Sequence, residues 1–205
     1  AEVDKCGHKI MKIWDANGDT LQYTINQTMM RVELPQPLKP GEKFSFHVDW
    51  YYYLIDRINS PSWGRGGYEY FEKDGNSLYT IVQWYPRLCV YNDAAGWQNK
   101  QFVGRGEFAL SFGNFIVKMT VPEDHIVGAT GECLNYPQVL SGERYNRWKL
   151  AQTATEPIEI VTLDEAQKAE KNKKPNGTKT WIYKADNVRD FAWTSSRKFI
   201  WDAMP

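Results

Sequence analysis

The sequence predicts an all-β chain of mainly antiparallel strands with one or two short surface helices. Its aromatic content is high, with nine Trp and twelve Tyr among 205 residues, and aromatic side chains favour the half-buried surface of a pleated sheet. Several short segments alternate apolar and polar residues and are separated by turns rich in Gly, Pro, Asn and Asp. Only one segment carries the signals of a helix. Together these observations favour antiparallel β structure.

The first quarter of the chain predicts three strands. KIMKIW (residues 9–14) and LQYTIN (residues 21–26) flank DANGDT, whose Asn-Gly pair suits a tight turn, so we expect these two strands to pair with each other. A proline-rich loop follows. After it, KFSFHVDWYYYLI (residues 43–55) predicts a strand. Its Phe, Phe and Val residues alternate with Ser, His and Asp, which is the pattern of a half-buried strand.

Further strands are predicted along the rest of the chain. Residues 78–91 are predicted to be extended, and residues 106–121 (GEFALSFGNFIVKMTV) predict two strands around Gly113 and Asn114. Residues 180–196 (TWIYKADNVRDFAWTSS) return to the alternation of apolar and polar residues that is typical of strands.

The clearest helix signal lies in TLDEAQKAEKNK, within a helical insertion at about residues 160–174. Thr162 and Glu165 have the spacing of a capping box, in which each side chain bonds the backbone of the other. The segment has almost no apolar face, so we expect a solvated surface helix. No internal repeat and no composition shift divides the chain, which therefore predicts a single domain over residues 1–205.

Charge and hydropathy exclude several classes of partner. Lys plus Arg and Asp plus Glu each number 25, so no net field attracts nucleic acid or an anionic membrane. No apolar run approaches the roughly 20 residues that cross a bilayer. We therefore expect neither nucleic acid nor a membrane as a partner. The compartment stays open, with a periplasmic or secreted location favoured over a cytoplasmic one.

Catalytic and metal-binding motifs are absent from the sequence, so no catalytic and no metal-ligating residue is assigned. The three histidines are isolated, without the H-E-x-x-H pattern of zinc peptidases, and no G-x-S-x-G elbow occurs. Cys6, Cys89 and Cys133 are far apart and form no C-x-x-C pair. One disulfide with a free thiol and three buried thiols both remain open.

Four segments resemble, in the same order, the N-terminal domain of zinc aminopeptidases of the aminopeptidase N family. The first contains an L-x-x-P-L-x-P-G-E loop before a strand, and the second an aromatic-Pro pair followed by an aromatic and Asp. The third has a strand, Val-Pro, a short turn and Gly, and the fourth resembles the last strand and exit of that domain. The segments are LPQPLKPGEKFSFHVDWYYYLIDR, YTIVQWYPRLCVYNDAAGW, FGNFIVKMTVPEDHIVGATGE and ADNVRDFAWTSSRKFIWDA.

This resemblance implies a non-catalytic N-terminal β domain, a saddle-like β-sandwich that packs on its own catalytic domain and closes one side of the peptide-binding cleft. Peptide substrate would be met only at the rim of that cleft. The zinc and the hydrolase chemistry would belong to a catalytic domain absent from this chain, which alone should hold no cofactor and be inactive. The family usually has more strands than the sequence offers before Lys9, which is consistent with a truncated start. Residues 141–179 look specific to a lineage.

The resemblance also indicates which surface residues to examine. We interpret VQWYPRLCVYNDAAGW (residues 82–97) as a strand and its exit loop, with Trp84 and Val90 inward. The residues expected at the rim, facing the cleft or the next domain, are Arg87, Tyr91, Asp93 and Trp97.

Two alternatives remain open at this stage. The chain could be a stand-alone carbohydrate-binding β-sandwich, in which exposed and coplanar aromatic rings such as Trp63 and Trp97 would stack on sugars. The apolar tail FIWDAMP (residues 199–205) could either dock on a following domain or pack back on its own sheet.

Overall fold

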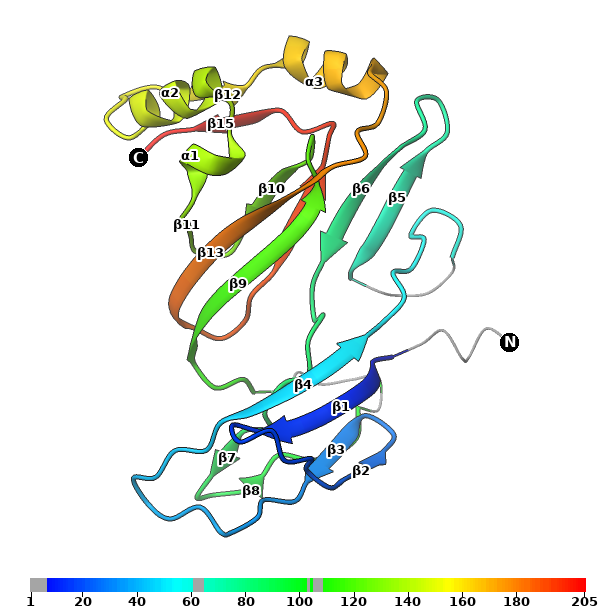
Figure 1. Cartoon of the computed structure of the whole chain (residues 1–205), viewed down its shortest axis with the longest axis vertical. Coiled ribbons are helices and arrows are strands. Elements are labelled where there is room, and N and C mark those ends of the chain that lie inside the picture. The colour runs from blue at the N-terminus through cyan, green and yellow to red at the C-terminus, as the bar shows by residue number, and fades with distance from the viewer. Residues whose placement is uncertain (1–6, 61–64, 103, 105–108) are drawn as a thin grey trace. The chain divides into compact units, whose positions relative to one another are not determined.

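The computed structural model describes residues 7–60, 65–102, 104 and 109–205, and it confirms the predicted all-β class with short helices (Figure 1). Every pairing between two of its named strands is antiparallel. Within the described residues, no helix is both long and apolar enough to span a membrane. The strands are β1 (Lys9–Asp15), β2 (Tyr23–Asn26), β3 (Met29–Val32), β4 (Phe46–Tyr51), β5 (Gly67–Phe71), β6 (Asn76–Ile81), β7 (Tyr91–Asn92), β8 (Gly96–Trp97), β9 (Gly113–Pro122), β10 (Ile126–Ala129), β11 (Glu132–Cys133), β12 (Ile158–Val161), β13 (Thr178–Val188), β14 (Trp193–Ser196) and β15 (Trp201–Ala203).

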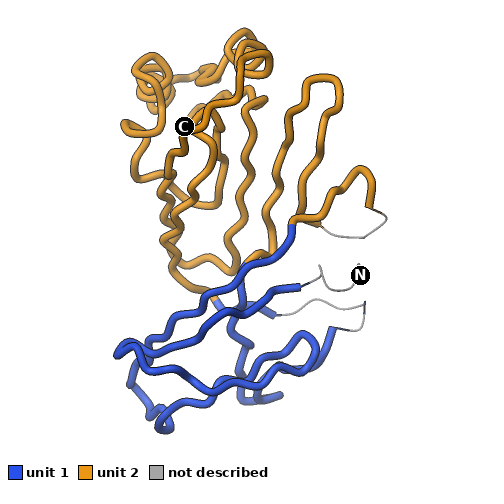
Figure 2. Tube along the Cα trace, turned by 45° about the vertical axis from the view of Figure 1, so that its right-hand side comes forward, with its two compact units in different colours: residues 1–53, 85–111 blue, residues 54–84, 112–205 orange. Residues whose placement is uncertain are grey.

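The chain divides into two compact units, which Figure 2 shows in different colours. Unit 1 comprises residues 1–53 and 85–111, and unit 2 comprises residues 54–84 and 112–205. Each unit therefore draws on two separate stretches of sequence, so a linear scan for a boundary finds none. The prediction of a single domain remains a prediction.

Unit 2 is built on two sheets with the strand orders β10-β14-β6-β5 and β11-β13-β9. The ladder between β9 and β13 is the longest, and runs from the pair Thr178–Pro122 to the pair Val188–Gly113 with one irregularity near its end (Figure 1). Alternation explains why this ladder forms. In β9, Val117, Met119 and Val121 are buried while the intervening residues are exposed, as the two-residue period of a half-buried strand requires.

The core of unit 2 is aromatic and β-branched. Trp181, Phe191 and Ile160 are fully buried, and Phe191 packs against Phe115 with ring centroids 6.0 Å apart. Trp181, Tyr183 and Phe191 are the aromatic side chains that are buried in this core, and the other described aromatic residues of the unit are half-buried or exposed.

Three helices connect the strands of unit 2: α1 (Tyr136–Val139), α2 (Gly142–Ala151) and α3 (Leu163–Lys171). The predicted capping box is confirmed, because Thr162 accepts from the backbone of Glu165 and the Glu165 carboxylate accepts from the backbone of Thr162. Glu165 also pairs with Arg144 and Arg147 of α2, at 3.2 and 2.6 Å. Burial alone would raise the pKa of Glu165, but these hydrogen bonds and charges lower it to about 2. Helix α2, which the sequence analysis missed, begins after the N-cap Ser141.

The apolar tail packs on its own unit through β15, as one of the two alternatives for it predicted. Strand β15 pairs with β12, placing Trp201 opposite Val161. The Trp201 ring lies 5.7 Å from that of Tyr136, measured between centroids.

Unit 1 contains the sheet β1-β4 and the hairpins β2-β3 and β7-β8. The prediction that residues 9–14 pair with residues 21–26 is wrong: β1 pairs with β4, with Ile13 opposite Val48, and β2 pairs with β3. Next to the turn, the two segments meet only at their ends within the described residues, where Trp14 forms a bridge with Thr20 and the Leu21 N–H donates to the Ile13 carbonyl at 3.0 Å. The turn itself is present, because the Asp15 carboxylate accepts hydrogen bonds from the backbone N–H groups of Asn17 and Asp19.

The structure also bears on two other strand predictions. The extended segment predicted over residues 78–91 ends at Ile81, two residues before Gln83, whose φ of 52° is incompatible with a continuing strand. In the described part of the region 106–121, the second predicted strand is found as β9. Residues 109–112 belong to no strand, and residues 105–108 lie outside the described residues.

We predict that Trp181→Ala lowers the free energy of unfolding by about 3–5 kcal/mol, because it opens a cavity at a fully buried position. Denaturant unfolding followed by far-UV circular dichroism measures this change. Ile116→Ala in the partner strand is the control, since Ile116 is 68% exposed, and we expect it to change stability by no more than about 0.5 kcal/mol. Equal effects of the two substitutions would contradict the assigned core.

Candidate functional site

The four residues predicted at the rim all lie in unit 1, on or next to the hairpin β7-β8. Tyr91 and Trp97 face each other across the hairpin as a register pair, with ring centroids 5.2 Å apart, and both are exposed. Asp93 is exposed in the turn. Arg87 is half-buried, and its guanidinium lies over the ring of Tyr85 at 5.3 Å from the centroid. Their role at an interface stays a prediction.

The geometry of the aromatic pair bears on the carbohydrate alternative. The planes of Tyr91 and Trp97 meet at 66° in an edge-to-face arrangement. A platform that stacks on a sugar ring needs exposed and coplanar faces, and this pair does not provide one. Trp63, the other aromatic residue considered for that role, lies outside the described residues.

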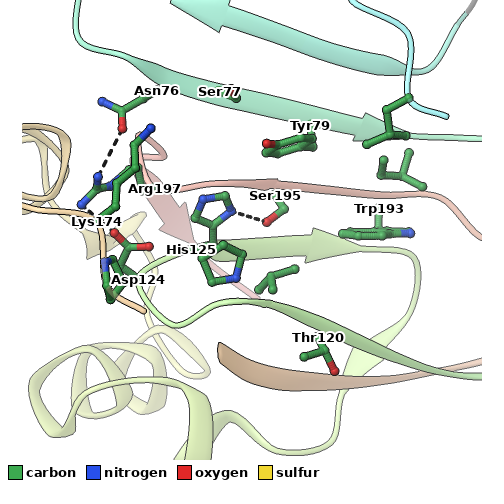
Figure 3. A pocket seen from close by; sticks show the side chains of 15 residues that line it. Asn76, Ser77, Tyr79, Thr120, Asp124, His125, Lys174, Trp193, Ser195 and Arg197 are labelled. Atoms are coloured by element: carbon green, nitrogen blue, oxygen red, sulfur yellow. Dashed lines mark hydrogen bonds and ion pairs between the residues drawn. The ribbon is translucent and has the colours of Figure 1, made fainter. Parts of the chain in front are cut away.

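A cavity of unit 2 lies elsewhere, among residues that the sequence analysis did not select. It has a volume of about 380 Å³ and is lined by β6, β9, β14, the turn between β9 and β10, and the segment after α3 (Figure 3). This volume is in the range of small-molecule sites, roughly 300–1,000 Å³. The side chains that contribute its polar wall are Asn76, Asp124, His125, Lys174, Ser195 and Arg197.

His125 and Ser195 form the middle of this wall. The His125 Nδ1 atom lies 2.8 Å from the Ser195 Oγ atom, and both side chains are buried. Antiparallel pairing of β10 with β14 allows this contact. It places Ser195 opposite Val127, so His125, two residues before Val127, lies diagonally from Ser195. The two residues are 70 positions apart in sequence.

A buried ion pair closes one end of the cavity. The Nη2 atom of Arg197 lies 2.6 Å from the Oδ2 atom of Asp124, and the Arg197 side chain is only 4% exposed. The same guanidinium donates to the Asn76 side chain at 3.3 Å and to the Asn172 carbonyl at 3.2 Å. A buried charge is stable only when it is paired and hydrogen-bonded. These partners pair the guanidinium and bond its two terminal nitrogens, whereas its Nε atom has no hydrogen-bond partner among the described residues.

The electrostatic surroundings keep His125 neutral. Burial is the main cause that lowers the pKa of His125 below its ordinary value of 6.5, and nearby Arg197, Lys179 and Lys174 lower it further. Only the adjacent Asp124 opposes this shift. The imidazole is therefore uncharged at neutral pH and acts as a hydrogen-bonding wall of the cavity.

The arrangement differs from that of a hydrolytic triad. A Ser-His-Asp triad needs a carboxylate that orients the imidazole and an accessible serine. Here the Asp124 carboxylate pairs with Arg197, and Ser195 is only 1% exposed. This geometry suits binding better than nucleophilic attack.

Other candidate chemistry is dispersed over the structure. In the described part of the chain, no cluster of three or more metal-ligating side chains is found. Cys89 and Cys133 are free thiols, and Cys6 lies outside the described residues. The Sγ atom of Cys89 lies 3.8 Å from the sulfur of Met29.

Comparison of the chain with protein-family models, with curated proteins and with solved structures gave no match. Function is therefore argued from the residues themselves.

We predict that the free energy of unfolding falls as the pH is lowered from about 7.5 to about 5, across the ordinary pKa of histidine. The unfolded chain takes up a proton at residue 125 near pH 6.5, whereas the folded chain takes it up only at lower pH. The unfolded state therefore binds more protons in this window, and acid favours it. Denaturant titrations at several pH values measure the slope.

The variant His125→Gln should show a smaller slope in the same titrations. His47→Gln serves as the control, because His47 is exposed and stacks on Trp14. An unchanged slope in His125→Gln would show that another group is responsible.

Proposed function

We propose that this chain is the non-catalytic N-terminal domain of a zinc-dependent aminopeptidase of the aminopeptidase N family, and that it packs on the catalytic domain of the full-length protein. The observation that carries the proposal is the order of the four sequence segments that resemble this family. An antiparallel all-β fold with short helices supports it, because that is the kind of domain which the resemblance implies.

The positions of two of these segments in the fold also support the proposed family. Residues 112–132 contain β9 and β10, and residues 185–203 contain the end of β13 together with β14 and β15. The two segments pair with each other twice, through Phe115 opposite Ala185 and through Ile126 opposite Ser196. Segments that are far apart in sequence thus form one framework, as expected if they belong to the same domain type.

The surface of unit 1 supports a packing role. In its described part, Ile13 and Leu21 are the buried hydrophobic side chains, whereas many large hydrophobic side chains are exposed. A high density of exposed apolar side chains is typical of surfaces that bind another protein. The exposed set is Met11, Tyr23, Ile25, Leu34, Leu38, Phe46, Tyr51, Tyr53, Leu88, Tyr91, Trp97 and Phe102.

In the proposed full-length enzyme the chemistry belongs to the catalytic domain. A zinc-bound water, activated by a glutamate, would attack the first peptide bond. The present chain would contribute a wall of the cleft, and its rim residues would meet the catalytic domain or the peptide.

The genomic reading frame beyond Pro205 and the protein it encodes test the proposal. We expect an H-E-x-x-H motif within roughly a hundred residues, the scale of part of a domain. The full-length protein should hydrolyse leucine p-nitroanilide and lose this activity with a zinc chelator, and the isolated chain should be inactive. A continuing frame without the motif, or chelator-sensitive peptidase activity of the isolated chain, would overturn the proposal.

The rim residues are tested in the same full-length protein. We predict that the double substitution Tyr91→Ser with Trp97→Ser lowers its melting temperature by several degrees, because roughly 1–2 kcal/mol of apolar burial at the interface is lost. Differential scanning calorimetry measures the shift. Leu163→Ser is the matched control, since Leu163 is 50% exposed on α3 and lies in the expected insertion. Equal shifts would place the rim residues away from the interface.

A further inference from the structure

We propose that the cavity of unit 2 binds a small amphipathic anion, with an aromatic or other apolar body and a carboxylate head. This site is separate from the interface of the proposed function, and the inference does not depend on that function. It rests on the separation of polar and apolar side chains along the cavity, on the balance of charge at its polar end, and on the fixed positions of its walls.

Polar and apolar groups are segregated along the cavity (Figure 3). Asn76, Asp124, Lys174 and Arg197 gather at one end, and Trp193 lies at the other. Further apolar side chains line the cavity, namely Leu54, Ile81 and Val121. Small-molecule sites combine such apolar walls with a few polar groups that fix the orientation of the ligand. A ligand with one apolar and one polar end matches this arrangement.

The charge at the polar end favours an anion. Asp124 neutralises Arg197 through their ion pair. Lys174 is different: its ammonium group contacts the carbonyl of Gly75, and no carboxylate of the described residues lies within ion-pair distance of it. Among the charged side chains that line the cavity, Lys174 is therefore the one without an ion-pair partner in the described structure. A carboxylate can meet it with a charge-assisted hydrogen bond, which is stronger than a neutral one.

The middle of the cavity favours the body of the ligand rather than a second polar group. The Ser195 hydroxyl and the His125 Nδ1 atom already satisfy each other at 2.8 Å. The ring of Tyr79 lies beside that of His125, with centroids 6.0 Å apart. The flat faces of these rings offer contact area to an aromatic body.

The walls hold their positions without a ligand. Tyr79 lies opposite Ser195 in the pairing of β6 with β14, and the Ser196 hydroxyl donates to the Ser77 carbonyl at 2.9 Å. Asn76 is 1% exposed and donates to the carbonyls of Asp74 and Glu170 at 3.1 Å. Because these side chains are already ordered, a ligand loses little affinity to the ordering of the site.

Isothermal titration calorimetry of the 205-residue chain with a matched set of probes tests the proposal. Phenylacetate carries both the aromatic body and the negative charge. Phenylacetamide keeps the shape of phenylacetate but is uncharged, and phenethylamine carries a positive charge instead. Acetate keeps the carboxylate but lacks the aromatic body. We expect phenylacetate to bind about tenfold more tightly than each of the others, equivalent to about 1.4 kcal/mol. The proposal would be overturned if the amide bound as tightly as phenylacetate, if the amine bound more tightly, or if phenylacetate did not bind at about 10 mM.

Substitutions locate the binding within the cavity. Lys174→Gln removes the charge at an exposed position but keeps a donor for Gly75, so it should fold normally and weaken phenylacetate binding about tenfold. Lys173→Gln is the matched control, because Lys173 is the preceding exposed lysine and does not line this cavity. In addition, the indole N–H resonance of Trp193 should shift on titration with phenylacetate. Equal effects of the two lysine variants, or an unmoved Trp193 resonance, would contradict the site.

Discussion

The guanidinium of Arg197 connects three separate parts of unit 2, and the arrangement around the cavity depends on it. It bonds Asn76 at the start of β6, the carbonyl that follows α3, and Asp124 in the turn between β9 and β10. Removing one partner from a buried ion pair costs about 3–5 kcal/mol, because the remaining charge is left without compensation. The turn, the strand and the end of the helix are therefore held to one position by a single side chain.

This constraint explains why polar groups line a cavity so close to the hydrophobic core. Trp181, Phe191 and Ile160 fill the interior of unit 2 without polar requirements. The buried polar side chains instead cluster where β6, β14 and the β9–β10 turn meet, and there several of them bond one another. Unit 1 differs, because its strands form two-stranded pairs that bury few apolar side chains. Its exposed aromatic residues are suited to contact with another surface, whereas the polar side chains of unit 2 border a cavity of about 380 Å³ beside the packed core.

Local patterns predicted the elements whose signals lie within a few residues. Strand β9 lies largely within the region 106–121 that the sequence predicted to be extended, and the spacing of Thr162 and Glu165 identified the start of α3. The partner of β1 could not be found this way, because the nearest strand-forming segment in sequence is not its neighbour in space. Similarly, no local signal ends β6 at Ile81, where the backbone turns near Gln83 through a positive φ.

The candidate site likewise depends on contacts between residues that are far apart in the sequence. In the sequence His125 is an isolated histidine, and nothing near Ser195 or Arg197 indicates a role for them. The reason is that their partners are tens of residues away. By itself, the sequence determined the all-β class, the alternation of individual strands and the capped helix, because each depends on the periodicity or hydrogen bonding of adjacent residues. Only the tertiary structure decided which strands pair and which polar groups meet in the cavity. Those choices depend on packing and on the pairing of buried charges between distant segments, which no local pattern encodes.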